Sequence, residues 1–472
     1  MPRYFVTLIV AIALFMENMD STVIATSLPA IAADLGEDPI ALKLALTSYF
    51  LSLAVFIPLS GWVADRFGAR TVFRAAIVVF ALGSAACGFA QSLPDFVLFR
   101  IVQGIGGAMM VPVGRLVILR TVPKSELISA LAWLTIPALL GPVIGPPLGG
   151  FITTFVSWRW IFWINIPMGV LGVILATRFI TNIREAELPP LDVKGFILSG
   201  IGLAGLAFGF TTIGQGLLPP WVSLSLLGAG AIGCWLYVRH AHDATAPLID
   251  LSLLKVKTFY ASVVGGFLFR VGIGATPFLL PLLLQLGFGM TPFQAGLLTF
   301  ASAVGAIAMK TTAAPILRRF GFRSVLVVNA LISGLFIASS GLFTPTTPHI
   351  VILVVLLVGG FFKSLQFTSI NSLAYADIEP RVMSRATSFA SVAQQLSMSA
   401  GVAVGALVLE FERFGRHQAT VQSDDFAAAF VVIAAIAASS ALIFFMLPKE
   451  AGRSLSAPAR PVGTPQDSVS QA

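Results

Sequence analysis

RFGARTVF at residues 66–73 and RFGFRSVL at residues 319–326 are near copies of one another, and each lies between two long apolar runs. A weaker echo pairs Val122-Pro123 with Glu379-Pro380. In both pairs the copies lie eight apolar runs apart, so they share one side of a membrane and predict two parallel repeats. Parallel repeats around a site at the membrane midplane are typical of secondary transporters.

The composition indicates that lipid is the solvent of this chain. Of the 472 residues, 57% are hydrophobic and only 11% are charged, and the mean hydropathy is +0.93. Soluble domains carry about 25% charged residues, so these values exclude a large soluble catalytic module. The two cysteines lie inside apolar runs and predict neither a disulfide framework nor a metal site. The sequence has no phosphate-binding loop, which disfavours ATP-driven transport, and no cofactor is expected.

Fourteen apolar runs are long enough to cross a bilayer as helices, for which roughly 20 residues are needed. We therefore predict an all-α polytopic membrane protein. The first run continues past Asp20 without a small-residue cleavage site, so we expect it to be a span rather than a cleaved signal peptide. The predicted spans are 4–28, 44–64, 75–93, 96–119, 127–155, 160–177, 195–213, 218–238, 258–286, 293–317, 324–343, 349–375, 386–409 and 426–447.

The basic residues predict the orientation. Between the predicted spans, 20 lysines and arginines fall on the side of the N-terminus, and four fall on the other side: Lys43, Arg159, Arg413 and Arg416. An excess of this size predicts that both termini are cytoplasmic. The formal net charge of +8 therefore reflects membrane topology. Nucleic acid is not expected as a partner, because no soluble domain carries a basic stripe.

Five motifs resemble the major facilitator superfamily, and specifically its fourteen-helix drug:proton antiporters. GWVADRFGAR at 61–70 is similar to the loop signature of the superfamily, and RIVQGIGG at 100–107 to its fourth-helix motif. GPVIGPPLGG at 141–150 resembles the fifth-helix antiporter motif. DSTVIATSLP at 20–29 and WRWIFWINIP at 158–167 resemble the fourteen-helix branch. The resemblance implies a multi-pass protein of a bacterial inner membrane.

The resemblance also implies a domain organisation: two parallel six-helix repeats plus two inserted central helices. We expect an N-terminal six-helix bundle at 1–184, two inserted helices with their linkers at 185–257 and a C-terminal six-helix bundle at 258–448. Residues 449–472 are rich in Ser, Pro, Ala and Gln and are expected to form a disordered cytoplasmic tail.

Charged residues at bilayer depth are costly and therefore mark candidate functional positions. They are Glu17, Asp20, Arg100, Arg270, Lys310 and Lys363. Asp20 and Glu17 lie three positions apart, on one helical face, where each raises the proton affinity of the other.

We expect Asp20, Glu17 and Arg100 to couple transport to protons, and Glu17, Asp20, Arg270 and Lys363 to face a substrate cavity. Alternatively, Asp20 caps locally or pairs with a buried arginine. Arg100 stays charged and suits tuning or orienting an acid, although a purely structural pair is equally compatible with the sequence. Lys310 is expected to snorkel to the cytoplasmic end of its helix.

The resemblance implies a cytoplasmic gate formed by Gly61, Asp65, Arg66, Gly68 and Arg70. Asp65 would cap a helix end, while Arg66 and Arg70 would pair across the two halves. The alternative is that these basic residues only enforce topology. The antiporter motif supplies Gly141, Pro142, Gly145, Pro146, Gly149 and Gly150, which predict a bend and tight packing. The resemblance implies that this segment limits proton leak.

The leading hypothesis from sequence is a proton-coupled antiporter that exports hydrophobic, cationic small molecules or drugs by alternating access. Its partners would be the small-molecule substrate, protons and the lipid bilayer. An exporter of one specific metabolite is an alternative on the same scaffold. A membrane enzyme is disfavoured, because no clustered nucleophile, acid pair or metal set faces the interface. A channel is disfavoured by the parallel repeats and by the resemblance to antiporter motifs. His240 and His242 lie in a predicted loop without companion metal ligands.

Overall fold

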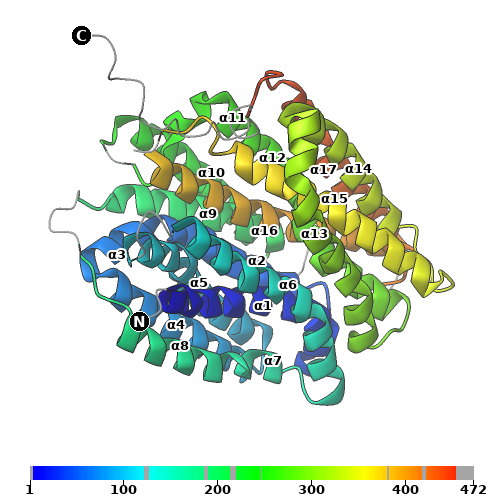
Figure 1. Ribbon diagram of the computed structural model, residues 1–472. Coiled ribbons are helices and arrows are strands. Elements are labelled where there is room, and N and C mark those ends of the chain that lie inside the picture. The colour runs from blue at the N-terminus through cyan, green and yellow to red at the C-terminus, as the bar shows by residue number, and fades with distance from the viewer. Residues whose placement is uncertain are drawn as a thin grey trace, which may run out of the picture.

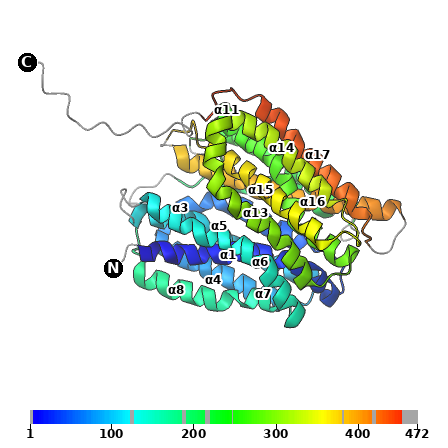
Figure 2. The same cartoon turned by 45° about the vertical axis from the view of Figure 1, so that its right-hand side comes forward.

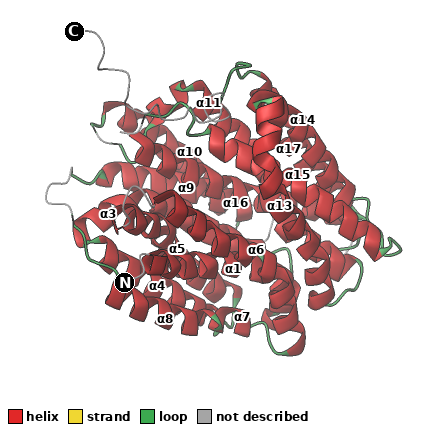
Figure 3. Cartoon of the chain, viewed as in Figure 1, coloured by secondary structure: helices red, strands yellow, loops and turns green. Residues whose placement is uncertain are grey.

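The computed structural model describes residues 4–121, 127–184, 190–212, 219–245, 247–379, 382–416 and 421–452, and within these ranges all regular structure is helical (Figure 3). Thirteen helical segments of the described residues are long and apolar enough to cross a membrane. The helix Leu127–Phe155, of 29 residues, covers a further predicted span. The protein is therefore an all-helical polytopic chain. Of the predicted tail at 449–472, residues 449–452 are described and form turns, and residues 453–472 lie outside the described residues.

We call α1 to α8 the first half of the fold and α11 to α17 the second half (Figure 1). The described residues of the first half form eight α-helices and one short 3-10 turn. These elements are α1 (Tyr4–Leu35), α2 (Lys43–Phe56), η1 (Ile57–Leu59), α3 (Ser60–Phe67), α4 (Ala69–Cys87), α5 (Leu93–Thr121), α6 (Leu127–Phe155), α7 (Trp160–Trp163) and α8 (Asn165–Phe179). Elements α2, η1 and α3 form one span of 25 residues. Helices α7 and α8 form another, of 20 residues.

The remaining elements follow after residue 190. They are α9 (Val193–Thr212), α10 (Pro220–Asp243), η2 (Leu251–Lys255), α11 (Lys257–Tyr260), η3 (Ala261–Gly265), α12 (Gly266–Leu282), η4 (Leu283–Gly287), α13 (Pro292–Phe320), α14 (Phe322–Ser340), α15 (His349–Leu373), α16 (Met383–Gly415) and α17 (Asp425–Phe445). Elements α11 to η4 form a single span of 31 residues with two π-helical turns.

Four helices differ from their predicted bounds by five residues or more: α1, α4, α10, which ends at Asp243 rather than at 238, and α16, which ends at Gly415 rather than at 409. His240 and His242 therefore lie in α10 and not in a loop. Helix α1 continues through Pro29 to Leu35 instead of ending at Leu28, because a proline in a membrane helix is tolerated when neighbouring helices satisfy the freed carbonyl. Helix α4 begins at Ala69 and ends at Cys87 rather than covering 75–93. Its first two turns include Arg70 and Arg74, which hydropathy alone assigned to a loop.

Both halves use the same packing scheme. In each half the first spanning helix packs on the fifth, the second on the fourth, and the third on the fourth and sixth. The loops that carry the repeated sequence also share a backbone conformation, with φ of 94° at Gly68 and 74° at Gly321. Only glycine adopts such angles without strain. The contact pattern therefore relates the halves as the sequence repeat predicts.

The halves meet along two helix pairs, α6 with α13 and α2 with α16. Helix α1 begins and α17 ends on the same side of the bundle, at the left of Figure 2. We call this the termini side and the opposite side the far side. Helices α9 and α10 pack on one another, and α9 also contacts α2 and α16. His240 at the end of α10 bonds Asp192, which precedes α9 (2.6 Å).

Candidate functional site

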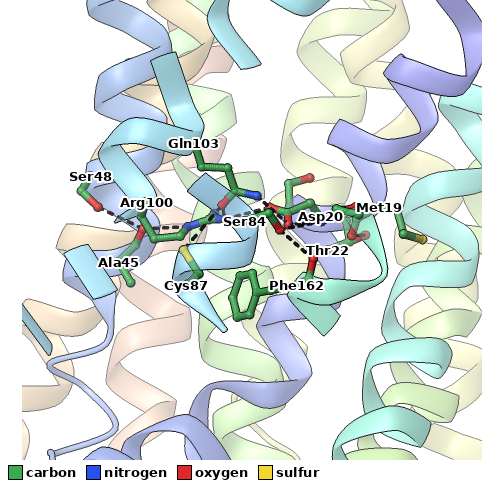
Figure 4. Close-up of polar contacts among 12 residues, drawn as sticks. Met19, Asp20, Thr22, Ala45, Ser48, Ser84, Cys87, Arg100, Gln103 and Phe162 are labelled. Carbon is green, nitrogen blue, oxygen red and sulfur yellow. Dashed lines mark hydrogen bonds and ion pairs between the residues drawn. The ribbon is translucent and has the colours of Figure 1, made fainter. Parts of the chain in front are cut away.

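A buried polar network surrounds Asp20 on α1 (Figure 4). One carboxylate oxygen accepts from Arg100 Nη1 (2.7 Å), and the other accepts from Gln103 Nε2 (2.8 Å) and Asn165 Nδ2 (2.9 Å). The side chains of Asp20 and Arg100 are each only 1% exposed. A carboxylate with three donors, one of them a guanidinium, is well satisfied in an apolar interior.

The network extends to most of the first half. Arg100 also donates to Gln103 Oε1 (2.6 Å) and lies 4.1 Å from the ring centroid of Tyr49 on α2. Asn165 donates to the hydroxyl of Ser84 on α4 (2.9 Å). Polar contacts therefore join α1, α2, α4, α5 and α8 around one ion pair.

A cavity of about 540 Å³ lies between the halves. From the first half it is lined by α1, α2 and α6, and from the second by α12, α13, α15 and α16. A volume of this size fits a drug-sized molecule. The predicted cavity residues Glu17 and Lys363 line it, whereas Asp20 and Arg270 do not. Asp20 is turned into the first-half network, and the structure therefore corrects its assignment to the cavity wall.

Glu17 is the one acidic residue in the described lining of the cavity. It is half-buried, and the neighbours that interact with it electrostatically are Arg115 on α5 and Asp20 on its own helix. Tyr49 lies beside it. Successive helical residues are rotated by about 100°, so three positions separate Glu17 and Asp20 by about 60°. That rotation is enough to place one carboxylate at the cavity and the other behind it.

Two lysines of the second half line the same cavity. Lys363 lies 14 residues into α15, about 21 Å from the start of the helix and well inside a bilayer. Lys310 on α13 is exposed and donates to Thr368 Oγ1 (2.8 Å). The structure thus places Lys310 on the cavity wall, where the sequence predicted a side chain directed to the helix end.

Arg270 lies behind this wall rather than in it. Its guanidinium is 5.5 Å from the ring centroid of Phe367, which does line the cavity, and it donates to Asn371 Oδ1 (2.7 Å). Its Nε is buried without a hydrogen-bond partner in the described structure. The assignment of Arg270 to the cavity wall is therefore corrected to a position one layer deeper.

The residues of the predicted antiporter motif pack α6 against two helices. A Cβ at Gly141, Gly145 or Gly149 would collide with α1, at Met19, Thr22 and Val23 respectively. A Cβ at Gly150 would meet the carbonyl oxygen of Pro292, where α13 of the other half begins. Pro142 and Pro146 line the cavity. Tight packing was expected here, and the glycine contacts show that it joins α6 to α1 and to α13.

The predicted gate loop contacts its own half. Arg70 donates to the carbonyl of Ile180 (3.4 Å), and the amide of Thr71 donates to Asn182 Oδ1 (3.3 Å). The Asn182 side chain also fills the space beside Gly68. Arg66 is exposed and has no ion pair with a described residue, and Gly61 faces open space. Asp65 lies in the last turn of α3, directly before this loop. The predicted pairing of Arg66 and Arg70 across the halves is therefore absent from the described residues in this conformation.

At the far side, by contrast, ion pairs join the halves. Lys43 at the start of α2 bonds Glu410 on α16 (3.0 Å), and Arg413 on α16 pairs with Asp38. The amide of Phe293 donates to Thr154 Oγ1 (3.1 Å) beside the Gly150 contact. From sequence, Lys43 and Arg413 were expected only to set the topology, and their role in this closure was not predicted. The single clue was an acid at 410 near a span end.

Parallel helical halves around a central cavity, closed at one side, are the architecture of a secondary transporter. The chain belongs to the Major Facilitator Superfamily, whose model matches residues 10–237 and 262–469. It is therefore a transport protein and not an enzyme.

Similar proteins include "Putative multidrug resistance protein MdtD" of Salmonella heidelberg (strain SL476), 37% identical over 455 residues that cover 95% of each chain. The protein of that name from Serratia proteamaculans (strain 568) is 38% identical over 424 residues, covering 90% of this chain and 88% of the relative. Among solved structures, a D-xylose-proton symporter has a TM-score of 0.68 at 17% identity, over 95% of this chain and 99% of that one. The last similarity concerns the fold alone.

Proposed function

We propose that the protein is a proton-coupled antiporter that exports small molecules with an apolar body across the inner membrane by alternating access. The names of its relatives support drug-type export. The distribution of basic residues supports cytoplasmic termini, so that the termini side faces the cytoplasm. In that orientation the structure is a state closed to the outside.

The cavity between the halves is the observation that carries this proposal. It is lined by both halves, and its far side is closed by Lys43–Glu410 and Arg413–Asp38. Breaking these pairs while closing the termini side would expose the same cavity to the other compartment. Alternating access needs only that exchange of contacts around a fixed site.

We assign the exchanged proton to Glu17 rather than to Asp20. Glu17 lines the cavity, so a proton and a substrate can both influence it. Asp20 has its oxygens occupied by Arg100, Gln103 and Asn165, and it does not line the cavity. Its role in this scheme is to hold α1, and with it Glu17, against α5 and α8.

Transport by purified protein in liposomes with an imposed pH gradient tests this assignment. A broad panel of apolar compounds is screened for accumulation against a concentration gradient. The wild type is expected to drive uphill accumulation of at least one compound. Glu17→Gln should abolish the uphill component and retain downhill exchange, because only the proton site is lost. Full uphill transport by Glu17→Gln would refute the assignment, and its absence from the wild type would refute proton coupling.

A further inference from the structure

The second-half wall of the cavity carries positive charge without a matching acid. Lys310 and Lys363 line the cavity and Arg270 lies behind Phe367. None of the three forms a salt bridge with, or interacts electrostatically with, an acidic residue among those the structure describes. Cations at membrane depth are normally paired, so two lysines on one wall without a described acidic partner, and an arginine behind that wall in the same state, need an explanation.

Glu17 does not neutralise this wall. Its electrostatic neighbours are Arg115 and Asp20, and neither lysine is among them. The other acid nearby, Asp20, is already paired with Arg100. The first-half wall is thus internally balanced, while the second-half wall keeps its positive charge facing the cavity.

The backbones that carry the two lysines are held against one another. A Cβ at Gly305 would overlap the carbonyl oxygen of Leu357, and one at Gly360 would overlap that of Ser302, so the backbones of α13 and α15 are in direct contact. Ser364 strengthens this contact by donating to the carbonyl of Ala306 (3.1 Å). Small residues that allow such close approach are the usual means of locking two membrane helices. The lysine pair is therefore presented by a preorganised surface.

The rest of the cavity is suited to an apolar body. Its lining includes Phe50, Leu53, Ile273, Phe278 and Met398. Apolar walls with a few placed charges are typical of sites that bind small molecules with a defined orientation. A ligand that satisfies both features has an apolar skeleton and one negatively charged group.

We infer that the cavity binds organic anions, namely carboxylates on an apolar body, with Lys363 and Lys310 as the groups that bind the carboxylate. The inference rests on the proposed transport function and specifies its substrate class. It replaces the cationic substrate expected from sequence, which relied on the acids of α1 alone. A cation in this cavity would meet one carboxylate that already interacts with Arg115 and two lysines without a described acidic partner, with Arg270 behind Phe367.

Binding of three fluorescent probes with the same skeleton tests the inference: 1-pyrenebutyrate, its methyl ester and 4-(1-pyrenyl)butylamine. Affinity is measured by fluorescence on the purified full-length protein in detergent, without a proton gradient. We expect the acid to bind roughly 10- to 100-fold more tightly than the ester, as for a hydrogen bond to a charged group, and the amine to bind most weakly.

The variants separate charge from shape. Lys363→Gln should remove most of the preference for the acid over the ester, whereas Lys363→Arg should retain it. Lys310→Gln should reduce it less, because Thr368 shares that ammonium. Lys255→Gln, at an exposed position of η2 outside the cavity lining, is the matched control and should leave all three affinities unchanged.

Three outcomes would overturn the inference: equal or tighter binding of the amine, an unchanged preference for the acid in Lys363→Gln, or no binding of the acid by the wild type up to its solubility. The proposed function fails separately, since it requires uphill transport. Tight binding of the acid without any uphill transport would refute proton coupling and leave the substrate class intact. Uphill export of cations but not of anions would support proton coupling and refute the anionic substrate class.

Discussion

Replacing Asp20 by asparagine should destabilise the protein strongly while preserving the shape of the side chain. The substitution leaves the buried Arg100 guanidinium without a counter-ion. It also replaces one carboxylate oxygen by an amide NH2, so that a donor faces a donor at one or more of the three contacts. Loss of one partner of a buried ion pair costs about 3–5 kcal/mol. For a protein of this size we expect the Tm to fall by about 3–5 °C.

Thermal unfolding of the detergent-purified protein measures this with a thiol-reactive fluorophore, because Cys87 is buried and becomes reactive when the bundle opens. Glu17→Gln is the matched control, since Glu17 is half-buried and outside the ion pair, and its Tm should stay within about 2 °C of the wild type. The double variant Asp20→Asn with Arg100→Gln should be more stable than Asp20→Asn alone. A wild-type Tm for Asp20→Asn, or an equal loss in the control, would show that the network does not hold the first half together.

Three further outcomes are expected. Glu410→Ala should weaken the far-side closure, so that a reagent added from outside labels a cysteine in the cavity more readily. Lys43→Ala should have the same effect, because each variant removes one partner of the same 3.0 Å pair. Unequal effects would argue against a shared gate. Gly296→Val should trap or misfold the protein, since a side chain there meets the carbonyl of Pro146, and retained transport would contradict the packing. In whole cells, a cysteine at Ser423 should react with an impermeant reagent and one at Glu450 should not; the reverse would invert the proposed orientation.

The helices were largely predictable from sequence because lipid imposes one rule on every span: about 20 apolar residues that satisfy their own backbone. The errors occur where that rule has exceptions. The hydropathy criterion ended α1 at Leu28, but the helix continues past Pro29 to Leu35. It also placed Arg70 and Arg74 outside the third span, although both belong to the first two turns of α4.

The site was harder to predict because side-chain direction depends on packing across the bundle. The sequence identified Asp20, Glu17 and Arg100, and it left open a structural pair between Asp20 and an arginine, which is what the structure contains. It could not separate Glu17 from Asp20, since a rotation of about 60° decides which of them reaches the cavity.

Neutral partners were missed altogether. Gln103 and Asn165 lie inside recognised motifs but carry no charge. A search for side chains whose charge is costly in the membrane therefore does not detect them. Their contacts with Asp20, at 2.8 and 2.9 Å, appear only in three dimensions. An amide next to a membrane arginine, as at positions 100 and 103, is the signal that sequence reasoning had available.

The backbone contact between α13 and α15 has a kinetic consequence. Because Gly305 and Gly360 leave no room for sliding between these helices, Lys310 and Lys363 move as one unit when the halves rock against each other. A ligand held by its charge would therefore travel with the second half throughout the cycle. Its departure would be timed by the first half, which withdraws Glu17 and the apolar wall of α1 and α2. The dwell time of the substrate would then be set by one half and its capture by the other.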